Sequence, residues 1–354
     1  MIRKALGTLG RALSSDTNSR IDSAQFEIAE LRRHIFEQHL RDLELRRHIG
    51  FNIEQHLRDL KMLAGKQAAL AVSALESLPN LGAAGFRVSS QWGEDGILEW
   101  LISQLPMLKQ TFVEFGVEHY AEANTPFLLQ HRNWRGLIAD ISADAIETVR
   151  LSDLMWRHDL TAVHLQITRD NINDLLTDHG FAGEIGVLSV DVDGNDYWIW
   201  NAITVSNPGI IICEYNGLFG DRHPISVPPD DNFNRTEKHF TNLYWGSSIC
   251  AIQHLASSRG FTFVGSNTEG CNAFFVRNDL ATLVVDRIAD KRPRPPLYRE
   301  SRGKDGDLTY LSGPDRVAAI SEMPVVNVVT GERHILADYG PSLYSSHWIE
   351  LMGS

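Results

Sequence analysis

The stretch Ile185-Gly-Val-Leu-Ser-Val-Asp-Val-Asp-Gly-Asn-Asp-Tyr-Trp198 decides how the rest of the chain is interpreted. Its apolar first half, rich in valine, is typical of a strand buried on both faces of a parallel sheet. Three carboxylates follow at once, those of Asp191, Asp193 and Asp196. Ligands in open α/β sheets bind beyond the carboxyl ends of such strands. The cluster therefore suits ribose hydroxyls, a divalent metal or proton abstraction, although a polar turn before a helix gives the same letters.

Strand-like and helix-like segments alternate on both sides of this stretch. The predicted strands cover residues 111–116, 136–140, 162–167, 185–191 and 209–215, with a final pair at 261–264 and 273–276. The predicted helices cover residues 96–105, 124–131, 143–150, 171–180, 196–202 and 247–259. Such alternation predicts an α/β fold with a mostly parallel, doubly wound sheet of seven strands. A parallel sheet that ends in a hairpin-like pair matches the Rossmann-like outline of class I methyltransferases.

Composition narrows the classes of function. The 354 residues carry a formal net charge of −12, so the basic footprint of a nucleic-acid binder is missing. The three cysteines, Cys213, Cys250 and Cys271, are odd in number and unpaired in spacing, which favours a reducing compartment over a disulfide framework. No CxxC pair or HExxH motif suggests zinc, and no apolar run is long enough to cross a bilayer. We expect a cytoplasmic protein.

The N-terminal part of the chain differs from the rest. Residues 1–20 place apolar side chains at helical spacing among basic ones, which leaves open a flexible terminus or a helix on the inner face of the membrane. Residues 21–64 contain no proline and repeat Leu-Arg-Arg-His-Ile at 31–35 and 45–49, two heptads apart. This pattern predicts a coiled-coil helix that self-associates. The remaining segments are a linker over 65–85, a methyltransferase-like domain over 86–278 and a C-terminal extension over 279–354.

The ends of the first two predicted strands supply further candidates. The first strand ends in Val113-Glu-Phe-Gly-Val117, where Gly116 lets the main chain approach a ligand, such as the amino-acid part of a nucleotide cofactor. Asp140 ends the second strand, 24 residues after Gly116. A carboxylate at that position grips ribose hydroxyls in dinucleotide-binding sheets.

The fifth predicted strand and the loop after it add more. Glu214 ends that strand, and we expect it close to Asp191 and Asp193 because neighbouring strand ends meet at one edge of a sheet. Such an oxygen-rich group suits Mg²⁺ or Mn²⁺. Residues 216–242 then form a long polar loop, which in a compact domain is usually a lid or a substrate-binding segment. His223, within this loop, is the histidine best placed for general-base work.

A set of motifs falls in one order along the chain. They are Ser90-Gln-Trp-Gly-Glu-Asp-Gly96, Phe112-Val-Glu-Phe-Gly116, Asn124-Thr125, Trp134-Arg-Gly-Leu137, Thr168-Arg-Asp-Asn-Ile-Asn173, Leu188-Ser-Val-Asp-Val-Asp-Gly-Asn-Asp-Tyr-Trp198, Cys213-Glu-Tyr-Asn216 and the run from Gly260 to Arg277. With these motifs the chain resembles the FkbM-like, S-adenosylmethionine-dependent methyltransferases found among bacterial polysaccharide and glycan genes. The resemblance extends over residues 89–277 and leaves out the coiled coil.

The resemblance implies a site that binds S-adenosylmethionine and transfers its methyl group to a sugar or glycan hydroxyl. By position, it implies cofactor contacts from Glu114, Gly116, Asn124, Asp140 and Asp191. The base that takes the hydroxyl proton is then sought among Asp193, Asp196 and His223, and the candidate ligands of a divalent metal are Asp191, Asp193 and Glu214.

Two alternatives stay open. Asp191-Val-Asp193 is a DxD motif, which in nucleotide-sugar glycosyltransferases holds manganese and a diphosphate. The first turn has a single glycine, Gly116, where methyltransferases have more, which favours a non-catalytic scaffold in glycan synthesis. The acidic end of the second strand and the terminal strand pair favour methyl transfer.

Overall fold

The computed structural model of this protein describes residues 52–353 together with scattered residues between 30 and 45. Residues 52–73 are helical, but most of the predicted coiled coil over 21–64, and the whole of 1–20, lie outside the described residues. The chain divides into two compact units, Met1–Lys61 and Met62–Ser354. Among the described residues, no helix combines the length and apolarity that crossing a bilayer requires.

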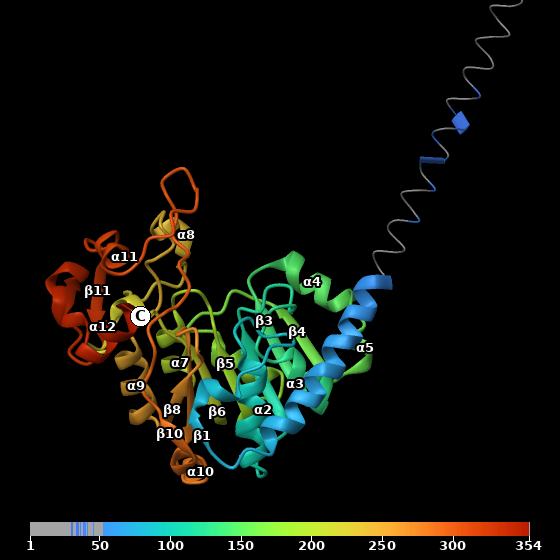
Figure 1. Cartoon of the computed structure of the whole chain (residues 1–354), viewed down its shortest axis with the longest axis horizontal. Coiled ribbons are helices and arrows are strands. Elements are labelled where there is room, and N and C mark those ends of the chain that lie inside the picture. Colours follow the sequence, from blue (N-terminus) through green and yellow to red (C-terminus); the bar gives the residue numbers. More distant parts are fainter. Residues whose placement is uncertain are drawn as a thin grey trace, which may run out of the picture. The chain divides into compact units, whose positions relative to one another are not determined.

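The second unit is built on a seven-stranded sheet in the order β4-β3-β2-β5-β6-β9-β8 (Figure 1). Its strands are β2 (Thr111–Phe115), β3 (Arg135–Asp140), β4 (Leu160–His164), β5 (Gly183–Val190), β6 (Ser206–Glu214), β8 (Phe261–Ser266) and β9 (Asn272–Arg277). Strands β2 to β6 run parallel, and β9 pairs antiparallel with both β6 and β8. One antiparallel strand placed next to the edge strand of a parallel sheet is the class I methyltransferase arrangement, so the predicted fold is confirmed.

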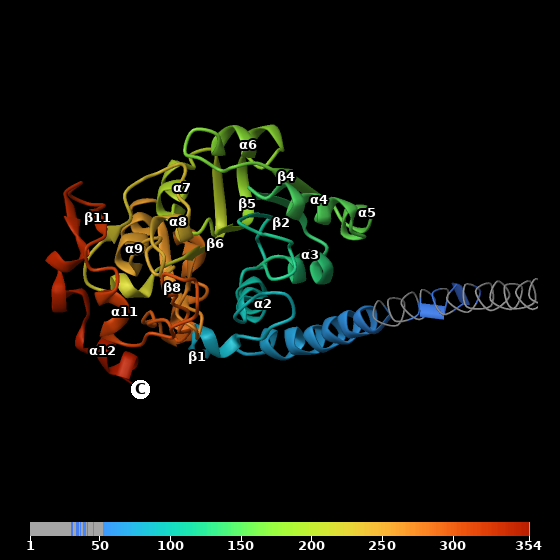
Figure 2. The ribbon, with the colours of Figure 1, turned by 90° about the horizontal axis from the view of Figure 1, so that it is seen from above.

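Helices cover both faces of this sheet (Figure 2). One face carries α2 (Glu94–Gln104), α3 (Pro126–Arg132) and α4 (Ala143–Leu151), and the other carries α6 (Ile172–Asp178), α7 (Asp196–Ala202) and α9 (Ile249–Ser258). Alternate side chains of a strand point to opposite faces. In β2, Phe112 therefore packs into the first core, whereas Val113 and Phe115 pack into the second. Burial on both faces explains the continuous apolar runs in the sequence.

The segments outside this sheet are ordered as well. The remaining strands are β1 (Leu78–Asn80), β7 (Ile225–Ser226), β10 (Ile288–Asp290), β11 (Pro324–Asn327) and β12 (Arg333–Ile335). The remaining helices are α5 (Leu154–Arg157), α8 (Arg235–Lys238), α10 (Asn278–Ala281), α11 (Pro314–Ala318) and α12 (Ser346–Gly353), with 3-10 turns η1 (Leu81–Ala84), η2 (Gly217–Phe219), η3 (Val285–Arg287), η4 (Leu336–Asp338) and η5 (Gly340–Leu343).

The pairing of these short strands joins two segments to distant parts of the chain. β1 pairs with β10, so the region expected as a linker over 65–85 is joined to the C-terminal part of the chain. β11 pairs with β7 and β12, which ties the expected extension over 279–354 to the 216–242 segment. Short strands with partners far along the chain leave little local periodicity, so sequence reasoning took these segments for a linker and an irregular tail.

Candidate functional site

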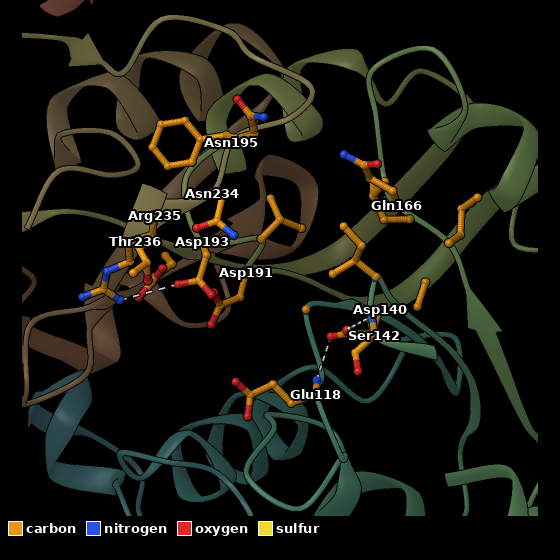
Figure 3. Close-up of a pocket in the computed structure, with 18 of the residues that line it drawn as sticks. Glu118, Asp140, Ser142, Gln166, Asp191, Asp193, Asn195, Asn234, Arg235 and Thr236 are labelled. Atoms are coloured by element: carbon orange, nitrogen blue, oxygen red, sulfur yellow. Dashed lines mark hydrogen bonds and ion pairs between the residues drawn. The ribbon is translucent and has the colours of Figure 1, made fainter. Parts of the chain in front are cut away.

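The candidate site lies where the strand order of the sheet reverses. β3 and β4 lie on one side of β2, whereas β5 and β6 lie on the other, so the carboxyl ends of β2 and β5 flank a crevice. A cavity of about 620 Å³ occupies this position. Figure 3 shows Asp140 and Gln166 on one side of it and Asp191 and Arg235 on the other. Gly116, Asp193 and Glu214 also line it.

Gly116 holds the two central strand ends together. Its φ of +74° lies in the left-handed region that favours glycine. A Cβ atom at this position would lie 1.5 Å from the main-chain oxygen of Asp191. The Gly116 N–H donates to the oxygen of Ala139 at 3.1 Å. The glycine is therefore required by the close approach of the ends of β2 and β5, whatever ligand binds beside them.

Asp140 presents its carboxylate to the cavity from the end of β3. Its Oδ2 accepts from the main-chain N–H of Glu118 at 2.8 Å, and its Oδ1 accepts from that of Ser142 at 2.7 Å (Figure 3). These two bonds fix the orientation of the carboxylate, and each of its oxygens keeps a further lone pair for a ligand hydroxyl. The structure thus brings two of the predicted cofactor contacts, Asp140 and Gly116, to one cavity.

Glu114 and Asn124, also predicted to contact the cofactor, are not among the residues that line this cavity. Glu114 is buried, and its oxygens accept from the main-chain N–H of Asn124 at 2.6 Å and from the N–H and Oγ1 of Thr125 at 3.0 and 2.5 Å. The Asn124 side chain donates to Ser189 Oγ at 3.0 Å. Both residues tie the start of α3 to the sheet, so we assign them a structural role.

Asp191 and Glu214 line the other side of the cavity, and together with the buried Asp196 they form an acidic trio. Carboxylate oxygens of Asp191, Asp196 and Glu214 lie within 4.8 Å of one another. Asp196 replaces Asp193 in the group of metal ligands expected from the sequence. Asp193 has a left-handed φ of +53°, and its carboxylate is 67% exposed and lies 3.5 Å from Arg235. Its side chain therefore lies in the cavity wall beside Arg235 and is not one of the three carboxylates of the trio.

The charges of the trio oppose one another in a position that is buried for Asp196 and partly buried for Asp191 and Glu214. Burial, followed by the charges of Asp193 and Asp196, raises the pKa of Asp191 well above its usual range. Burial and the charge of Asp191 do the same to the pKa of Glu214, and burial raises the pKa of Asp196 to about 7. Glu214 Oε2 is buried without a hydrogen-bond partner. A bound cation would relieve both the repulsion and the missing bond.

Asp196 also shapes the turn that holds the trio. Its Oδ1 accepts from the main-chain N–H of Val192 at 2.8 Å, and its Oδ2 accepts from that of Gly194 at 3.1 Å. These bonds close the turn between β5 and α7. Of the predicted bases, Asp196 is the one whose oxygens are already engaged by main-chain donors, which leaves it less free to take a proton.

His223, the third predicted base, is not among the residues that line the cavity. Its Nε2 lies 3.0 Å from Ser342 Oγ, and its ring packs 4.8 Å from that of Tyr339. Both partners belong to the C-terminal part of the chain. The structure therefore does not bring His223 to the cavity, because the loop folds against a region whose position the sequence did not reveal.

Arg235, on α8, is a site residue that sequence reasoning did not single out. Its Nε donates to the oxygen of Asn242 at 2.7 Å, and its guanidinium lies 3.5 Å from Glu300 and 5.0 Å from the centre of the Trp245 ring. With Asp193, these contacts occupy the guanidinium on several sides. The signal in the sequence was the long segment 216–242, expected as a lid or substrate-binding loop, which does supply one wall.

The acidic pair at the start of α2, Glu94 and Asp95, has a structural role. Asp95 Oδ2 accepts from the main-chain N–H groups of residues 88–90 at 2.7–2.9 Å. Glu94 Oε1 accepts from the side chains of Asn267 and Asn272 at 2.8 and 2.9 Å. The motif therefore fixes the start of α2 to the turn between β8 and β9.

Comparisons with known proteins found no matching family model and no matching curated protein. Among solved structures, the chain is similar to an O-methyltransferase family protein from Burkholderia thailandensis, at 14% identity and a TM-score of 0.32, covering 52% of this chain and 59% of that one. It is also similar to the CurJ carbon methyltransferase, at 13% identity and a TM-score of 0.32, covering 52% of each chain. A third, the N-terminal domain of EvdMO1 with SAH bound, has 10% identity and a TM-score of 0.36, covering 60% of this chain and 95% of that domain. The chain thus spans less than two thirds of the first two proteins.

Proposed function

We propose that this protein is an S-adenosylmethionine-dependent O-methyltransferase that acts on a sugar or glycan hydroxyl. The observation that carries the proposal is the cavity at the reversal of the strand order, with Gly116 and Asp140 on one side and, on the other, Asp191 and Glu214, the two members of the acidic trio that line it. The first side suits a nucleoside donor, and the second suits the activation of a hydroxyl. The resemblance to FkbM-like proteins supports the glycan acceptor.

The donor side offers complementary groups for each part of S-adenosylmethionine. Asp140 accepts from the ribose hydroxyls, and the methionine part lies beside the main chain of Gly116, which lines the cavity. Ile141, Leu165 and Ile167 line the same cavity and supply apolar contacts for the adenine ring. Excess negative charge in the cavity also favours the positively charged sulfonium.

The acceptor side must align a hydroxyl with the methyl group and remove its proton. In-line transfer forms the carbon–oxygen bond while the carbon–sulfur bond breaks, so positioning supplies much of the rate. Asp193 is our candidate for the base because its exposed carboxylate lies in the cavity wall. Arg235, beside Asp193, holds this carboxylate in place.

The trio fits a divalent metal. Asp191, Asp196 and Glu214 offer the hard oxygen ligands that Mg²⁺ and Mn²⁺ prefer, and the partnerless Glu214 oxygen lacks only a cation. When bound, such an ion lowers the pKa of a hydroxyl beside it. The chain's own contribution is to hold the three carboxylates within reach of one another and of Asp193.

The glycosyltransferase alternative has less support. A DxD motif requires both carboxylates to converge on one metal ion, whereas the Asp193 side chain pairs with Arg235 and is not part of the trio. Arg235, the cation among the described residues of the cavity wall, is itself occupied by carboxylates and offers little to a diphosphate.

A calorimetric titration with S-adenosylhomocysteine, with and without Mg²⁺, tests the proposal beside a panel of nucleotide sugars with Mn²⁺. We expect micromolar binding of S-adenosylhomocysteine, about −8 kcal/mol. Binding of a nucleotide diphosphate alone would support the glycosyltransferase instead. If neither S-adenosylhomocysteine nor a nucleotide sugar binds, the non-catalytic scaffold is favoured.

We also propose that the protein self-associates through its N-terminal helix and works in the cytoplasm. Within residues 52–73, Leu57, Leu60 and Leu63 are more than half exposed, at 54%, 61% and 58%. Leucines three residues apart lie along one side of a helix, and an exposed apolar side of this kind suits a second copy of the same helix. An association with the inner face of the membrane remains part of this proposal through residues 1–20.

A further inference from the structure

The turn after β2 has a glycine-like backbone at a position that holds glutamate. Gly116 and Glu118 have φ values of +74° and +44°, both in the left-handed region. In the glycine-rich turns of dinucleotide-binding sheets, two glycines stand at this spacing, and the second lets the ligand approach the main chain. Glu118 therefore occupies the position of the second glycine in the conformation that a glycine would have, although a side chain disfavours that conformation.

Main-chain bonds explain the backbone conformation of this turn. The Glu118 N–H donates to Asp140 Oδ2 at 2.8 Å and so helps to fix the carboxylate that we propose for the ribose. The Tyr120 N–H donates to the oxygen of Val117 at 2.7 Å and closes the turn. Neither bond uses the Glu118 side chain, so glycine at position 118 would keep both of them without strain.

Contacts within the fold do not explain the Glu118 side chain. Tyr120, another residue of this turn with a positive φ, +58°, has a buried ring, and its hydroxyl lies 2.7 Å from Thr125 Oγ1. Glu118 is exposed and lines the cavity, and its carboxylate has no hydrogen bond or ion pair with any residue that the structure describes. A side chain that strains the backbone without such a contact indicates a role in function.

The position of the Glu118 carboxylate suits the methionine part of the donor. In Figure 3 it extends away from the Asp140 carboxylate, toward the side of the view on which Asp191 lies. The methionine part carries one cation that donates hydrogen bonds, the α-ammonium group, because the sulfonium has no N–H or O–H. Glu114, which the sequence predicted as a cofactor contact, does not line the cavity, and both of its oxygens accept from residues at the start of α3. Glu118 is therefore the free carboxylate of this turn.

We infer that Glu118 binds the α-ammonium group of the donor and so selects donors that carry an amino-acid part. This assignment rests on the proposed function. A carboxylate accepts charge-assisted hydrogen bonds from an ammonium group, which has three N–H donors. A specificity-determining side chain then stands where a second glycine would be expected. The single glycine of the first turn is therefore compatible with donor binding and does not mark a non-catalytic scaffold.

Calorimetry with two ligands tests the assignment. S-adenosylhomocysteine and methylthioadenosine share the nucleoside and the sulfur, but only the first has the amino-acid part, and neither has a net charge at neutral pH. Glu118→Gln should weaken binding of S-adenosylhomocysteine about tenfold and change binding of methylthioadenosine less than twofold. The control is Glu122→Gln, because Glu122 also lines the cavity but pairs with Arg87 at 3.2 Å. It should change the binding of both ligands less than twofold.

Two results would overturn the assignment and leave the proposed function in place. One is an equal loss of affinity for both ligands in Glu118→Gln, and the other is unchanged binding of S-adenosylhomocysteine. If the unmodified protein binds neither ligand, the proposed function fails, and the role of Glu118 fails with it.

A second variant tests the backbone strain. Glu118→Gly keeps the main-chain bond to Asp140 and relieves the strain of the positive φ. Its unfolding temperature should therefore rise by about 1–3 °C, while its affinity for S-adenosylhomocysteine falls as in Glu118→Gln. A lower unfolding temperature would show that the Glu118 side chain supports the fold, and would overturn the assignment.

Discussion

Gly116 faces the main-chain oxygen of Asp191 across the centre of the sheet, at a distance that leaves no room for a Cβ atom. This contact sets the ends of β2 and β5 beside each other and so places the donor side and the acidic trio in one cavity. A ligand-binding glycine and a structural glycine are the same residue here.

Replacement of Gly116 should separate two effects, the steric clash with the Asp191 oxygen and the backbone strain of a positive φ. In Gly116→Ala, the Cβ would lie 1.5 Å from the Asp191 oxygen, so the strand ends must move apart. The matched control is Gly183→Ala, which also has a positive φ, +82°, but no atom within 4 Å. We expect the control to cost about 1 kcal/mol of unfolding free energy. Gly116→Ala should cost well over that in urea denaturation and abolish binding of S-adenosylhomocysteine; equal costs would contradict this assignment.

The acidic trio should lower the stability of the fold while it supports metal binding and activity. Asp191→Asn removes one of three mutually repelling buried carboxylates, so we expect a higher unfolding temperature in the presence of a chelator. The same variant should lose Mg²⁺ binding and at least a hundredfold in methyl transfer, on the order expected for a group at the reacting centre. Asp193→Asn is the control for the metal: it should keep Mg²⁺ binding in calorimetry, because Asp193 lies outside the trio. Loss of Mg²⁺ binding in both variants would instead make Asp191 and Asp193 the metal ligands, as the DxD motif suggests.

Metal binding should depend on pH in one direction. The pKa values of Asp191, Asp196 and Glu214 are raised, that of Asp196 to about 7. These carboxylates are therefore protonated at low pH. A metal must displace those protons, so its affinity rises as the pH rises through the raised pKa values. For each proton released, the affinity should rise by up to tenfold per pH unit below the pKa of that carboxylate and level off above it, which for Asp196 falls around pH 7. Titrations with Mg²⁺ at pH 6, 7 and 8 check this; a flat profile would argue against the trio as the ligand set.

Removal of the His223 side chain should leave catalysis intact. Its ring contacts Tyr339 and Ser342 and does not line the cavity. We expect His223→Ala to lower the unfolding free energy by about 1 kcal/mol and to leave the rate of methyl transfer from labelled S-adenosylmethionine unchanged. A loss of a hundredfold or more in that rate, with the stability unchanged, would return His223 to the site.

A charge on the exposed helix should weaken self-association. Leu60→Glu places a carboxylate among apolar side chains that we expect at the interface between two copies. Burial of a leucine stabilises by about 1.5–3 kcal/mol, so the dissociation constant should rise at least tenfold. Leu151→Glu is the control, because Leu151 is 79% exposed but lies on α4, outside the N-terminal helix over residues 52–73. Sedimentation of the two variants decides; a protein that is monomeric from the start would refute the interface.

Local patterns in the sequence carried much of the fold. The apolar runs of β2 to β6 are buried on both faces, and the helix expected over 196–202 coincides with α7. Asp140, Asp191 and Glu214 were expected at strand ends, and all three line the cavity. Strand burial and turn formation depend on residues close together in the chain, so they can be predicted from the local sequence.

Local patterns did not reveal which side chains converge. Asp193 and Asp196 stand three positions apart, but the left-handed backbone at Asp193 turns one of them toward Arg235. The sequence predicted a cofactor contact for Glu114, but in the structure both of its carboxylate oxygens accept hydrogen bonds from residues at the start of α3.

A parallel sheet with acidic strand ends can be predicted from the sequence, because strand burial and the residue at each strand end are encoded locally. The folded structure was needed to show which carboxylates form the trio, that His223 is not part of the cavity wall, and that Arg235 and other residues of the 216–242 segment form one side of it. Those relationships join segments far apart in the chain, and their geometry depends on packing that no single stretch contains.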